Sequence, residues 1–160
     1  MYISNHNHSL LGRIWICWDS SMVQFFGKVQ LNDNFEFFTS FIYADCDAKQ
    51  RRSRWKSLIR QASITKGFPW LILGDFNVTS KAREHSRRSS VSKVLINSIE
   101  VEDIRSMGFN YTWNNKRAGS EAVAKTLDRV IGNWDWFNKY GDSHCTYLSP
   151  GISDHCPSVV

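Results

Sequence analysis

Long apolar runs are absent from this sequence. None of its apolar stretches approaches the ~20 residues that a membrane-spanning helix requires. Residues 1–8 (MYISNHNH) also lack the basic start and the long apolar core of a signal peptide. The sequence therefore predicts a soluble protein with no membrane span, located inside the cell in the nucleus or the cytoplasm.

Cysteine is scarce, and the four cysteines are scattered. Cys17, Cys46, Cys145 and Cys156 show no Cys-x-x-Cys spacing, which argues against a zinc site and favours reduced, partly buried thiols. Internal repeats, low-complexity tracts and linkers are missing as well. With 160 residues, of which 42% are hydrophobic, the chain is expected to form a single domain over residues 1–160.

The net charge of +5, with a pI near 9.1, is compatible with an anionic partner. A surplus of this size is also common among proteins that bind no nucleic acid. Charge alone therefore does not decide the class of partner.

The order of periodicities predicts the secondary structure. Residues 14–18, 23–29 and 37–43 alternate apolar and polar side chains, and turn residues separate them, which predicts strands in two successive antiparallel hairpins. From residue 48 the spacing becomes helical, with a basic face opposite an apolar one. The expected apolar face holds Trp55, Leu58, Ile59 and Ala62, and the expected basic face holds Arg52, Lys56 and Arg60.

The second half of the chain mixes short strands with helices. Residues 70–73 (WLIL) are uniformly apolar, as in a strand buried on both faces. We expect a surface loop over 79–90, helices over 91–99 and 134–140, a short strand and turn over 108–115, a strand over 126–131, and extended pieces at 145–148 and 157–160. This pattern predicts an α/β or α+β sheet sandwich.

Three short motifs carry the candidate chemistry. Gly74-Asp75-Phe76-Asn77, Leu127-Asp128-Arg129 and Ser153-Asp154-His155 supply three carboxylates, an amide and an imidazole. A metal-assisted phosphodiesterase needs this set: a base for water, an oxygen ligand for Mg2+, and a group that binds the phosphate. We assign these roles to Asp75, Asp154 and His155 in turn. Asn77 would bond the phosphate or the water, and Asp128 would orient the imidazole.

Each motif also has a structural interpretation. Asp75 and Asn77 could form an Asx turn at a strand end. Asp128 and Arg129 could be a surface charge pair. Asp154-His155 could be a helix cap or a plain loop. A tyrosine such as Tyr43 at the end of a strand is more often a half-buried aromatic, although its phenol could donate to a phosphate.

Together the motifs resemble those of a known superfamily. Residues 73–77 (LGDFN), 127–130 (LDRV) and 153–155 (SDH) resemble the later signatures of the endonuclease/exonuclease/phosphatase superfamily, which has the DNase I-like fold. Residues 108–115 (GFNYTWNN), and the RRxxWxxL pattern over 51–58 after IYA at 42–44, are similar to the plant LINE-type retrotransposon branch. The resemblance runs from about Gly12 to the end of the sequence.

This resemblance implies a fold and a reaction. The fold would be a four-layer α-β-β-α sandwich with Mg2+ or Mn2+ as cofactor. The reaction would be a nick in DNA that leaves a 3′-hydroxyl and primes reverse transcription, with a reverse transcriptase domain as partner in a longer product. Five residues match catalytic and metal-binding positions of the superfamily: Asp75, Asn77, Asp128, Asp154 as the metal ligand, and His155. Tyr43 matches its phosphate-contacting tyrosine.

The sequence departs from the superfamily at its start. Members begin with a strand bearing an Asn, a helix, and a strand bearing a metal-binding Glu, but eleven residues precede Gly12 and no Glu occurs before Glu36. We therefore expect a partial sandwich, truncated at its N-terminus and lacking the first strand-helix-strand elements. Weak metal binding, reduced or lost activity, and self-association through an exposed sheet edge would follow.

A competing hypothesis is a catalytically dead nucleic-acid-binding module or a vestigial one. Two basic clusters could bind the phosphate backbone of DNA, or of RNA, without hydrolysis; they could equally be a solvated helix face and a mobile loop. A phosphatase or lipid phosphodiesterase is a third possibility. The clusters are Arg51, Arg52, Arg54 and Lys56, and Lys81, Arg83, Arg87 and Arg88.

Overall fold

The computed structural model describes residues 24–32, 35–87 and 98–160. A five-stranded mixed sheet runs through the described part, in the order β1-β2-β3-β8-β4. The predicted strand at 14–18 and most of the predicted helix at 91–99 lie outside the described residues. The strands are β1 (Gln24–Asn32), β2 (Phe35–Tyr43), β3 (Trp70–Asp75), β8 (Asp128–Asn133) and β4 (Val101–Asp103).

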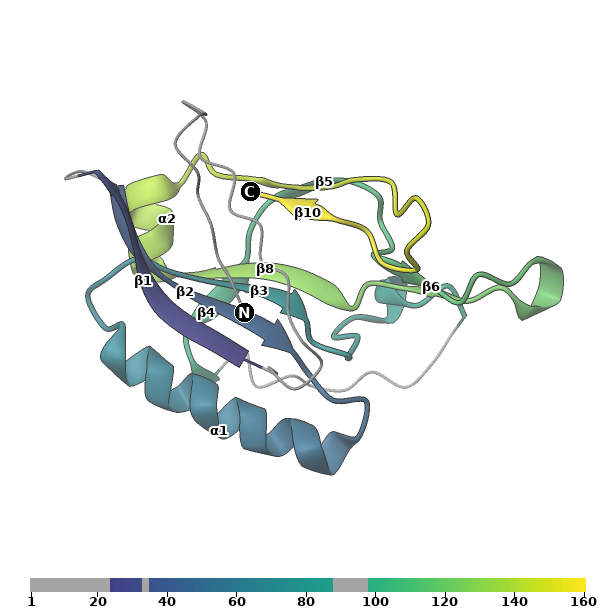
Figure 1. Cartoon of the computed structure of the whole chain (residues 1–160), viewed down its shortest axis with the longest axis horizontal. Helices are drawn as coiled ribbons and strands as arrows, with labels where there is room; N and C mark the ends of the chain where they lie inside the picture. The colour runs from purple at the N-terminus through teal and green to yellow at the C-terminus, as the bar shows by residue number, and fades with distance from the viewer. Residues whose placement is uncertain (1–23, 33–34, 88–97) are drawn as a thin grey trace.

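The large sheet is covered differently on its two faces (Figure 1). Helix α1 (Ala48–Ile64) packs on one face. On the other face lie helix α2 (Trp134–Tyr140) and a three-stranded sheet in the order β10-β9-β5. The described part therefore shows three of the four expected layers. The small sheet consists of β10 (Ser158–Val159), β9 (Cys145–Tyr147) and β5 (Ser106–Gly108).

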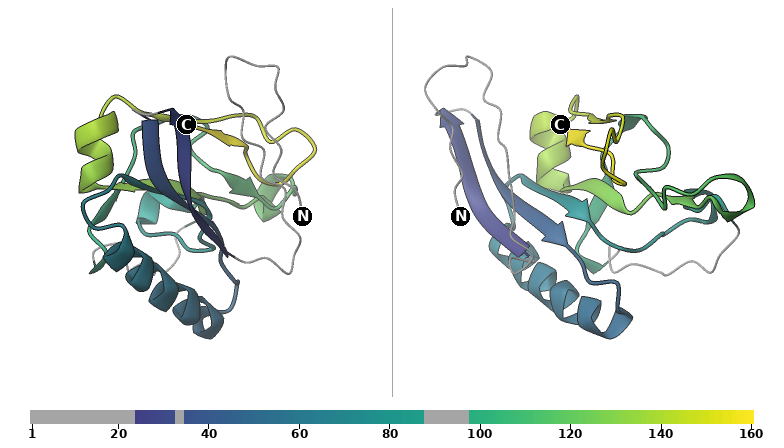
Figure 2. Two further views of the ribbon diagram at one scale, coloured as in Figure 1. Left: turned by 60° about the vertical axis from the view of Figure 1, so that its left-hand side comes forward. Right: turned by 45° about the vertical axis from the view of Figure 1, so that its right-hand side comes forward.

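A hairpin of β6 (Trp113–Asn114) and β7 (Ala124–Lys125) projects from the body of the molecule (Figure 2). The short helix η3 (Gly119–Glu121) forms its tip, and a second short helix, η1 (Ala82–Glu84), lies in the loop after β3. No helix in the described part is long and apolar enough to cross a membrane.

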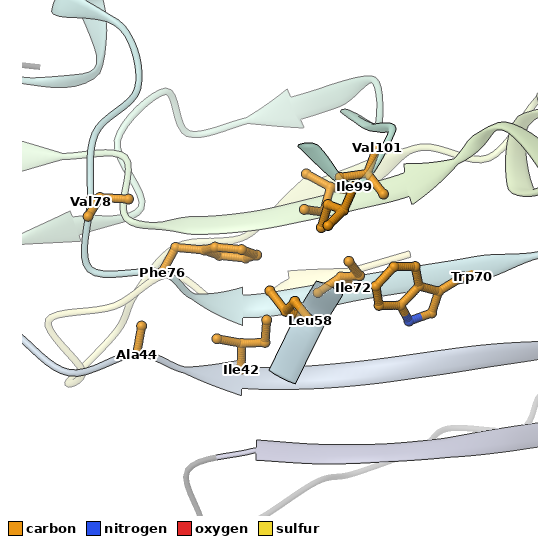
Figure 3. Close-up of a cluster of buried hydrophobic side chains, with 10 residues drawn as sticks. Ile42, Ala44, Leu58, Trp70, Ile72, Phe76, Val78, Ile99 and Val101 are labelled. Carbon is orange, nitrogen blue, oxygen red and sulfur yellow. The ribbon is translucent and has the colours of Figure 1, made fainter. Parts of the chain in front are cut away.

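Helix α1 begins where the sequence predicts and buries most of its expected apolar face. The side chain of its N-cap Asp47 accepts hydrogen bonds from the backbone N–H groups of Lys49 and Gln50, both at 2.9 Å. Leu58 packs against Ile42 of β2 and Ile72 of β3 (Figure 3). Ile59 is 43% exposed, so its assignment to the buried face was wrong; it lies one residue past Leu58, which turns it away from the sheet.

Strand β3 is the centre of the fold. It pairs in parallel with β2 and antiparallel with β8, and its side chains alternate between two cores. Trp70 and Ile72 point into the core under α1, whereas Leu71 and Leu73 point toward α2 and β9. This confirms the predicted two-sided burial. Since side chains two apart share a face, Asp75 follows Leu71 and Leu73 onto the face opposite α1.

The pairing register puts three polar side chains in one row. Asp75 lies opposite Tyr43 on β2 and opposite Asp128 on β8. Within the described residues β1 is one edge of the large sheet, and self-association through an edge remains a prediction.

We expect Gly74→Ala to destabilise the protein by about 3 kcal/mol or more. Gly74 has φ +132°, and a Cβ atom there would lie 2.0 Å from the carbonyl oxygen of Ile42. Gly67 has φ +81° with open space around the Cβ position, so Gly67→Ala should cost only about 1 kcal/mol. Urea denaturation of both variants checks this, and equal losses would contradict the close approach at Gly74.

Candidate active site

Residues 112–114, which include strand β6, bind the loop that carries Asp154 and His155 through backbone hydrogen bonds. Trp113 and His155 form an isolated β-bridge, and the N–H of Cys156 donates to the carbonyl of Thr112 at 2.7 Å. The N–H of Asn114 donates to the carbonyl of Asp154 at 3.0 Å. These bonds place the third motif beside the row of Tyr43, Asp75 and Asp128.

His155 and Asp128 form a direct pair. Nδ1 of His155 lies 3.0 Å from Oδ2 and 3.2 Å from Oδ1 of Asp128, so Nδ1 carries the proton that is donated to the carboxylate. Both side chains are largely shielded, with 31% and 15% of their surface exposed. Asp128 and Arg129 are neighbours on β8, so their side chains point to opposite faces of the strand. The alternative of a surface charge pair between them is therefore wrong.

Asp75 and Asn77 form a compact unit at the end of β3. Asn77 has φ +50°, a left-handed conformation that asparagine tolerates better than most residues. Oδ1 of Asp75 accepts the Asn77 N–H at 2.8 Å, and Oδ2 accepts Nδ2 of Asn77 at 3.0 Å. Nδ2 also donates to the carbonyl of Ala44 at 2.7 Å. The Asx turn is thus present, and it fixes the Asp75 carboxylate in the site.

The pKa of Asp75 is raised to about 6, mainly by burial and then by the charge of the neighbouring Asp128 carboxylate. The Asn77 N–H and the charge of His155 oppose this rise. Asp75 is 5% exposed. The result is a carboxylate that takes up or releases its proton near neutral pH, as a general base requires.

The hydrogen bond to Asp128 raises the pKa of His155, whereas burial lowers it. The charges of Asp128, Asp75 and Asp154 raise it further. Asp75 and His155 therefore lie within each other's electrostatic reach, although they belong to motifs some 80 residues apart. The arrangement favours a charged imidazolium beside three carboxylates.

Asp154 faces the same site from the loop. Its Oδ2 accepts a hydrogen bond from Nε1 of Trp113 at 2.9 Å, and its charge reaches Asp75, His155 and Tyr43. Of the two structural alternatives for Asp154-His155, a helix cap and a plain loop, the structure shows the loop.

A divalent cation is not accommodated by the described residues alone. Within 24–32, 35–87 and 98–160, no group of three or more His, Cys, Asp and Glu side chains is placed to hold a metal ion. Both oxygens of Asp75 accept from Asn77, and both oxygens of Asp128 face His155. Asp154 is thus the carboxylate of the site that is least occupied by protein donors.

Tyr43 closes the row at the end of β2 and is 44% exposed. Burial raises the pKa of its phenol, and the Asp75 charge raises it further. The hydroxyl therefore stays protonated at neutral pH and can donate a hydrogen bond.

A cavity of ≈ 470 Å³ opens beside Asp154. It offers an indole face, two cationic side chains and an exposed aliphatic side chain, a combination that suits a nucleic-acid strand. Its lining consists of Trp113, Asn115, Lys116, Arg117, Ile152, Ser153 and Asp154.

Sequence reasoning missed two hydroxyls that support the site. Oγ1 of Thr112 accepts from the backbone N–H groups of Leu127 and Asp128 at 3.0 and 2.9 Å. Oγ of Ser153 accepts the N–H of His155 at 3.0 Å. Ser153 belongs to the third motif, and Thr112 lies within the singled-out stretch 108–115. The sequence analysis named both stretches but predicted no role for either hydroxyl.

No model of a known protein family matches the sequence, and a search of curated proteins finds no match either. Solved structures do match. The endonuclease domain of TRAS1, a telomere-specific non-LTR retrotransposon, aligns with a TM-score of 0.66 at 15% identity, over 85% of this chain and 61% of that one. A conserved protein of unknown function from Enterococcus faecalis V583 gives 0.59 at 17% identity, over 97% and 57%.

The beta toxin of Staphylococcus aureus gives a TM-score of 0.56 at 15% identity, over 85% of this chain and 55% of the toxin. This chain therefore spans between 55% and 61% of the lengths of these three structures. At such identities the similarity shows the fold. The chain shares part of the fold of the TRAS1 endonuclease domain and of the APE2 catalytic domain of Xenopus laevis.

We expect Asp75→Asn to stabilise the protein above pH 6. The folded state raises the pKa of Asp75 from 3.8 to about 6, so folding loses stability as pH rises through this window, by up to about 3 kcal/mol. Asparagine carries no charge and keeps an acceptor for the Asn77 N–H, but its Nδ2 replaces the oxygen that accepts from Nδ2 of Asn77, a loss that offsets part of the gain. Its gain should be about 1–3 kcal/mol at pH 8 and should shrink toward pH 4.

Urea unfolding from pH 4 to 8 measures this difference. Asp142→Asn, at an exposed position, is the matched control and should show no such pH-dependent gain. A gain for Asp75→Asn that is the same at every pH would contradict the raised pKa.

Proposed function

We propose that this site hydrolyses phosphodiester bonds in DNA in a metal-dependent reaction of the retroelement endonuclease type. The observation that carries the proposal is the meeting of Asp75 with the His155–Asp128 pair on one face of the sheet. A base that titrates near neutral pH and an adjacent imidazolium are the two groups that in-line attack on a phosphodiester uses.

Asp75 is the proposed general base. Its carboxylate is held at the end of the rigid strand β3 by both bonds from Asn77, so it can accept a proton from an attacking water without reorienting. Above pH 6 it is ionised and able to do so.

His155 is the proposed phosphate-binding group. Asp128 holds Nδ1, which leaves Nε2 to donate to a phosphate oxygen or to the developing charge in the transition state. Tyr43, whose hydroxyl stays protonated, is a further proposed donor to the phosphate. The amide of Asn77 would donate to the phosphate only by releasing Oδ2 of Asp75 or the carbonyl of Ala44, which share its two Nδ2 hydrogens.

Mg2+ or Mn2+ is the proposed cofactor and would neutralise charge on the phosphate. Among the described residues Asp154 is the one proposed ligand, and it does not make a cation site by itself. We therefore assign no step to the ion. Binding should be weak unless a further carboxylate joins Asp154.

DNA is the proposed substrate, with RNA as the alternative. The strand is proposed to follow the cavity beside Asp154, which is lined by Trp113, Lys116 and Arg117. To bind its phosphates, Lys116 would release the carbonyl of Gly151 and Arg117 would release Glu121. The nuclease branch is proposed by analogy with the TRAS1 endonuclease domain, which shares the fold, as a mannosyl-6-phosphatase from Bacteroides thetaiotaomicron also does. Membership of the plant LINE-type branch and a reverse transcriptase partner are further parts of the proposal.

The test is nicking of supercoiled plasmid with Mg2+ or Mn2+. Asp75→Asn and His155→Ala should each lower the rate by about 10²–10⁴-fold. The rate should rise with pH as Asp75 ionises near 6 and fall once His155 loses its proton, giving a bell-shaped profile.

The exposed Asp142→Asn variant serves as the control and should nick like the wild type. Nicking that survives in both Asp75→Asn and His155→Ala, or that has no pH dependence between 5 and 8, would place the chemistry elsewhere.

A catalytically dead nucleic-acid-binding module is the second candidate, because no metal cluster forms within the described residues. Arg52, Lys56 and Arg60 are exposed on α1, as predicted, and could bind phosphates. Other predicted basic residues are already engaged: Arg51 donates to the carbonyls of Asp45 and Cys46, and Lys81 pairs with Asp103.

A salt titration of DNA affinity separates the two candidates. A binding module should lose affinity steeply with salt, bind equally well after Asp75→Ala, and nick under no metal condition. Metal-dependent nicking that is abolished by Asp75→Ala would exclude this candidate.

A further inference from the structure

Within the described residues, the half of β8 that carries Asp128 has no strand partner on its outer side. Strand β4 pairs with Ile131, Gly132 and Asn133 only, whereas β3 pairs with β8 from Gly132 to Asp128. The position of Asp128 therefore depends on contacts other than the sheet ladder on that side.

Arg129 supplies such a contact. It follows Asp128, so its side chain points to the opposite face of β8, where it is 3% exposed. Its guanidinium binds Oε2 of Glu84, Oγ of Ser80 at 2.6 Å, and the two carboxylate oxygens of Asp103 at 2.9 and 3.2 Å. One side chain thus joins β8, β4 and the loop after β3.

Glu84 organises that loop while it holds Arg129. Its carboxylate accepts the N–H of Ser80 at 2.6 Å and the N–H of Lys81 at 3.1 Å. Its carbonyl accepts the N–H of Thr126 at 2.8 Å, two residues before Asp128. Burial alone would raise the pKa of Glu84, but the bond and charge of Arg129 hold it below its usual value.

The loop held in this way begins at the site itself. Ser80 follows Asn77 by three residues, and Asn77 fixes both oxygens of Asp75. The Arg129–Glu84–Asp103 network therefore joins the segment bearing Asp75 and Asn77 to the segment bearing Asp128, from the face opposite the site.

We propose that Arg129 is a positioning residue that keeps Asp128, and through it the His155 imidazole, aligned with Asp75. This inference rests on the proposed function, because alignment matters for hydrolysis. Arg129 touches no substrate in this account. Both terminal nitrogens of the Arg129 guanidinium are held by partners on β4 and on the loop after β3, while its buried Nε has no hydrogen-bond partner among the described residues. The bonds of the two terminal nitrogens fix the guanidinium, so it can transmit a defined position to the residue next to it on the strand.

The test compares Arg129→Met, Arg129→Lys and Glu84→Gln with the wild type, after circular dichroism has confirmed folding. Lys28→Met is the matched control, since it removes a lysine from the Lys28–Glu36 ion pair, which lies toward the other end of the sheet. The first readout is the long-range ¹H–¹⁵N spectrum of His155 at one fixed pH, which reports whether Nδ1 carries its proton toward Asp128.

Arg129→Met and Glu84→Gln should change the Nδ1–H resonance of the His155 imidazolium, because its hydrogen bond to Asp128 is weakened. Arg129→Lys should keep most of the wild-type resonance, and Lys28→Met should keep all of it. In the second readout Arg129→Met should lower the nicking rate at saturating DNA by about 10- to 100-fold while DNA affinity changes little. A folded Arg129→Met or Glu84→Gln protein with an unchanged His155 spectrum would overturn the proposal.

The two readouts separate this inference from the proposed function. If the wild type does not nick, the proposed function fails, and the His155 spectrum still decides the role of Arg129. If Arg129→Met does not fold, the Glu84→Gln protein decides it, because glutamine keeps the shape of the side chain and removes its charge.

Discussion

The close approach of β2 and β3 at Gly74 is the constraint on which the site depends. A side chain at residue 74 would meet the Ile42 carbonyl, so the parallel register that sets Tyr43 beside Asp75 requires glycine there. The antiparallel pairing on the other side then sets Asp128 opposite Asp75. Backbone bonds between residues 112–114 and the Asp154-His155 loop then bring Asp154 and His155 beside the row of Tyr43, Asp75 and Asp128.

This geometry places like charges close together, which destabilises the folded state. Two carboxylates lie opposite each other on neighbouring strands, and one of them is nearly buried. Burial and the Asp128 charge raise the pKa of Asp75 to about 6, and the charge of His155 opposes that rise. The hydrogen bond to Asp128 raises the pKa of His155, and the surrounding carboxylates raise it further. Perturbed carboxylates of this kind cluster at functional sites, which agrees with the proposed role of Asp75 as a water-activating base.

The sequence predicted the parts of the structure that local patterns determine. The strand at 70–73 and the helix at 134–140 were identified because uniform apolar runs and aromatic spacing are local signals. The candidate residues were found through three motifs, and the structure brings them together; their roles stay predictions. The fold was predicted in part, since the described residues show three of its four layers.

The parts that could not be predicted depend on long-range contacts. Arg129 looks like a surface charge beside Asp128, and only the pairing of β8 reveals that it is buried against Glu84 and Asp103. Strand β4 has three residues and no pattern of its own, and Thr112 acts through an oxygen that accepts from two backbone groups fifteen and sixteen residues away. Sequence spacing carries no trace of such bonds.

The most direct test of one shared site is an NMR titration of the Asp75→Asn variant with duplex DNA, followed through backbone amide shifts. A single shared site predicts that the amide signals of four segments shift together with a single affinity: residues 43–47, 75–78, 113–117 and 153–156. Shifts confined to the exposed basic face of α1, with residues 75–78 and 153–156 unmoved, would contradict it.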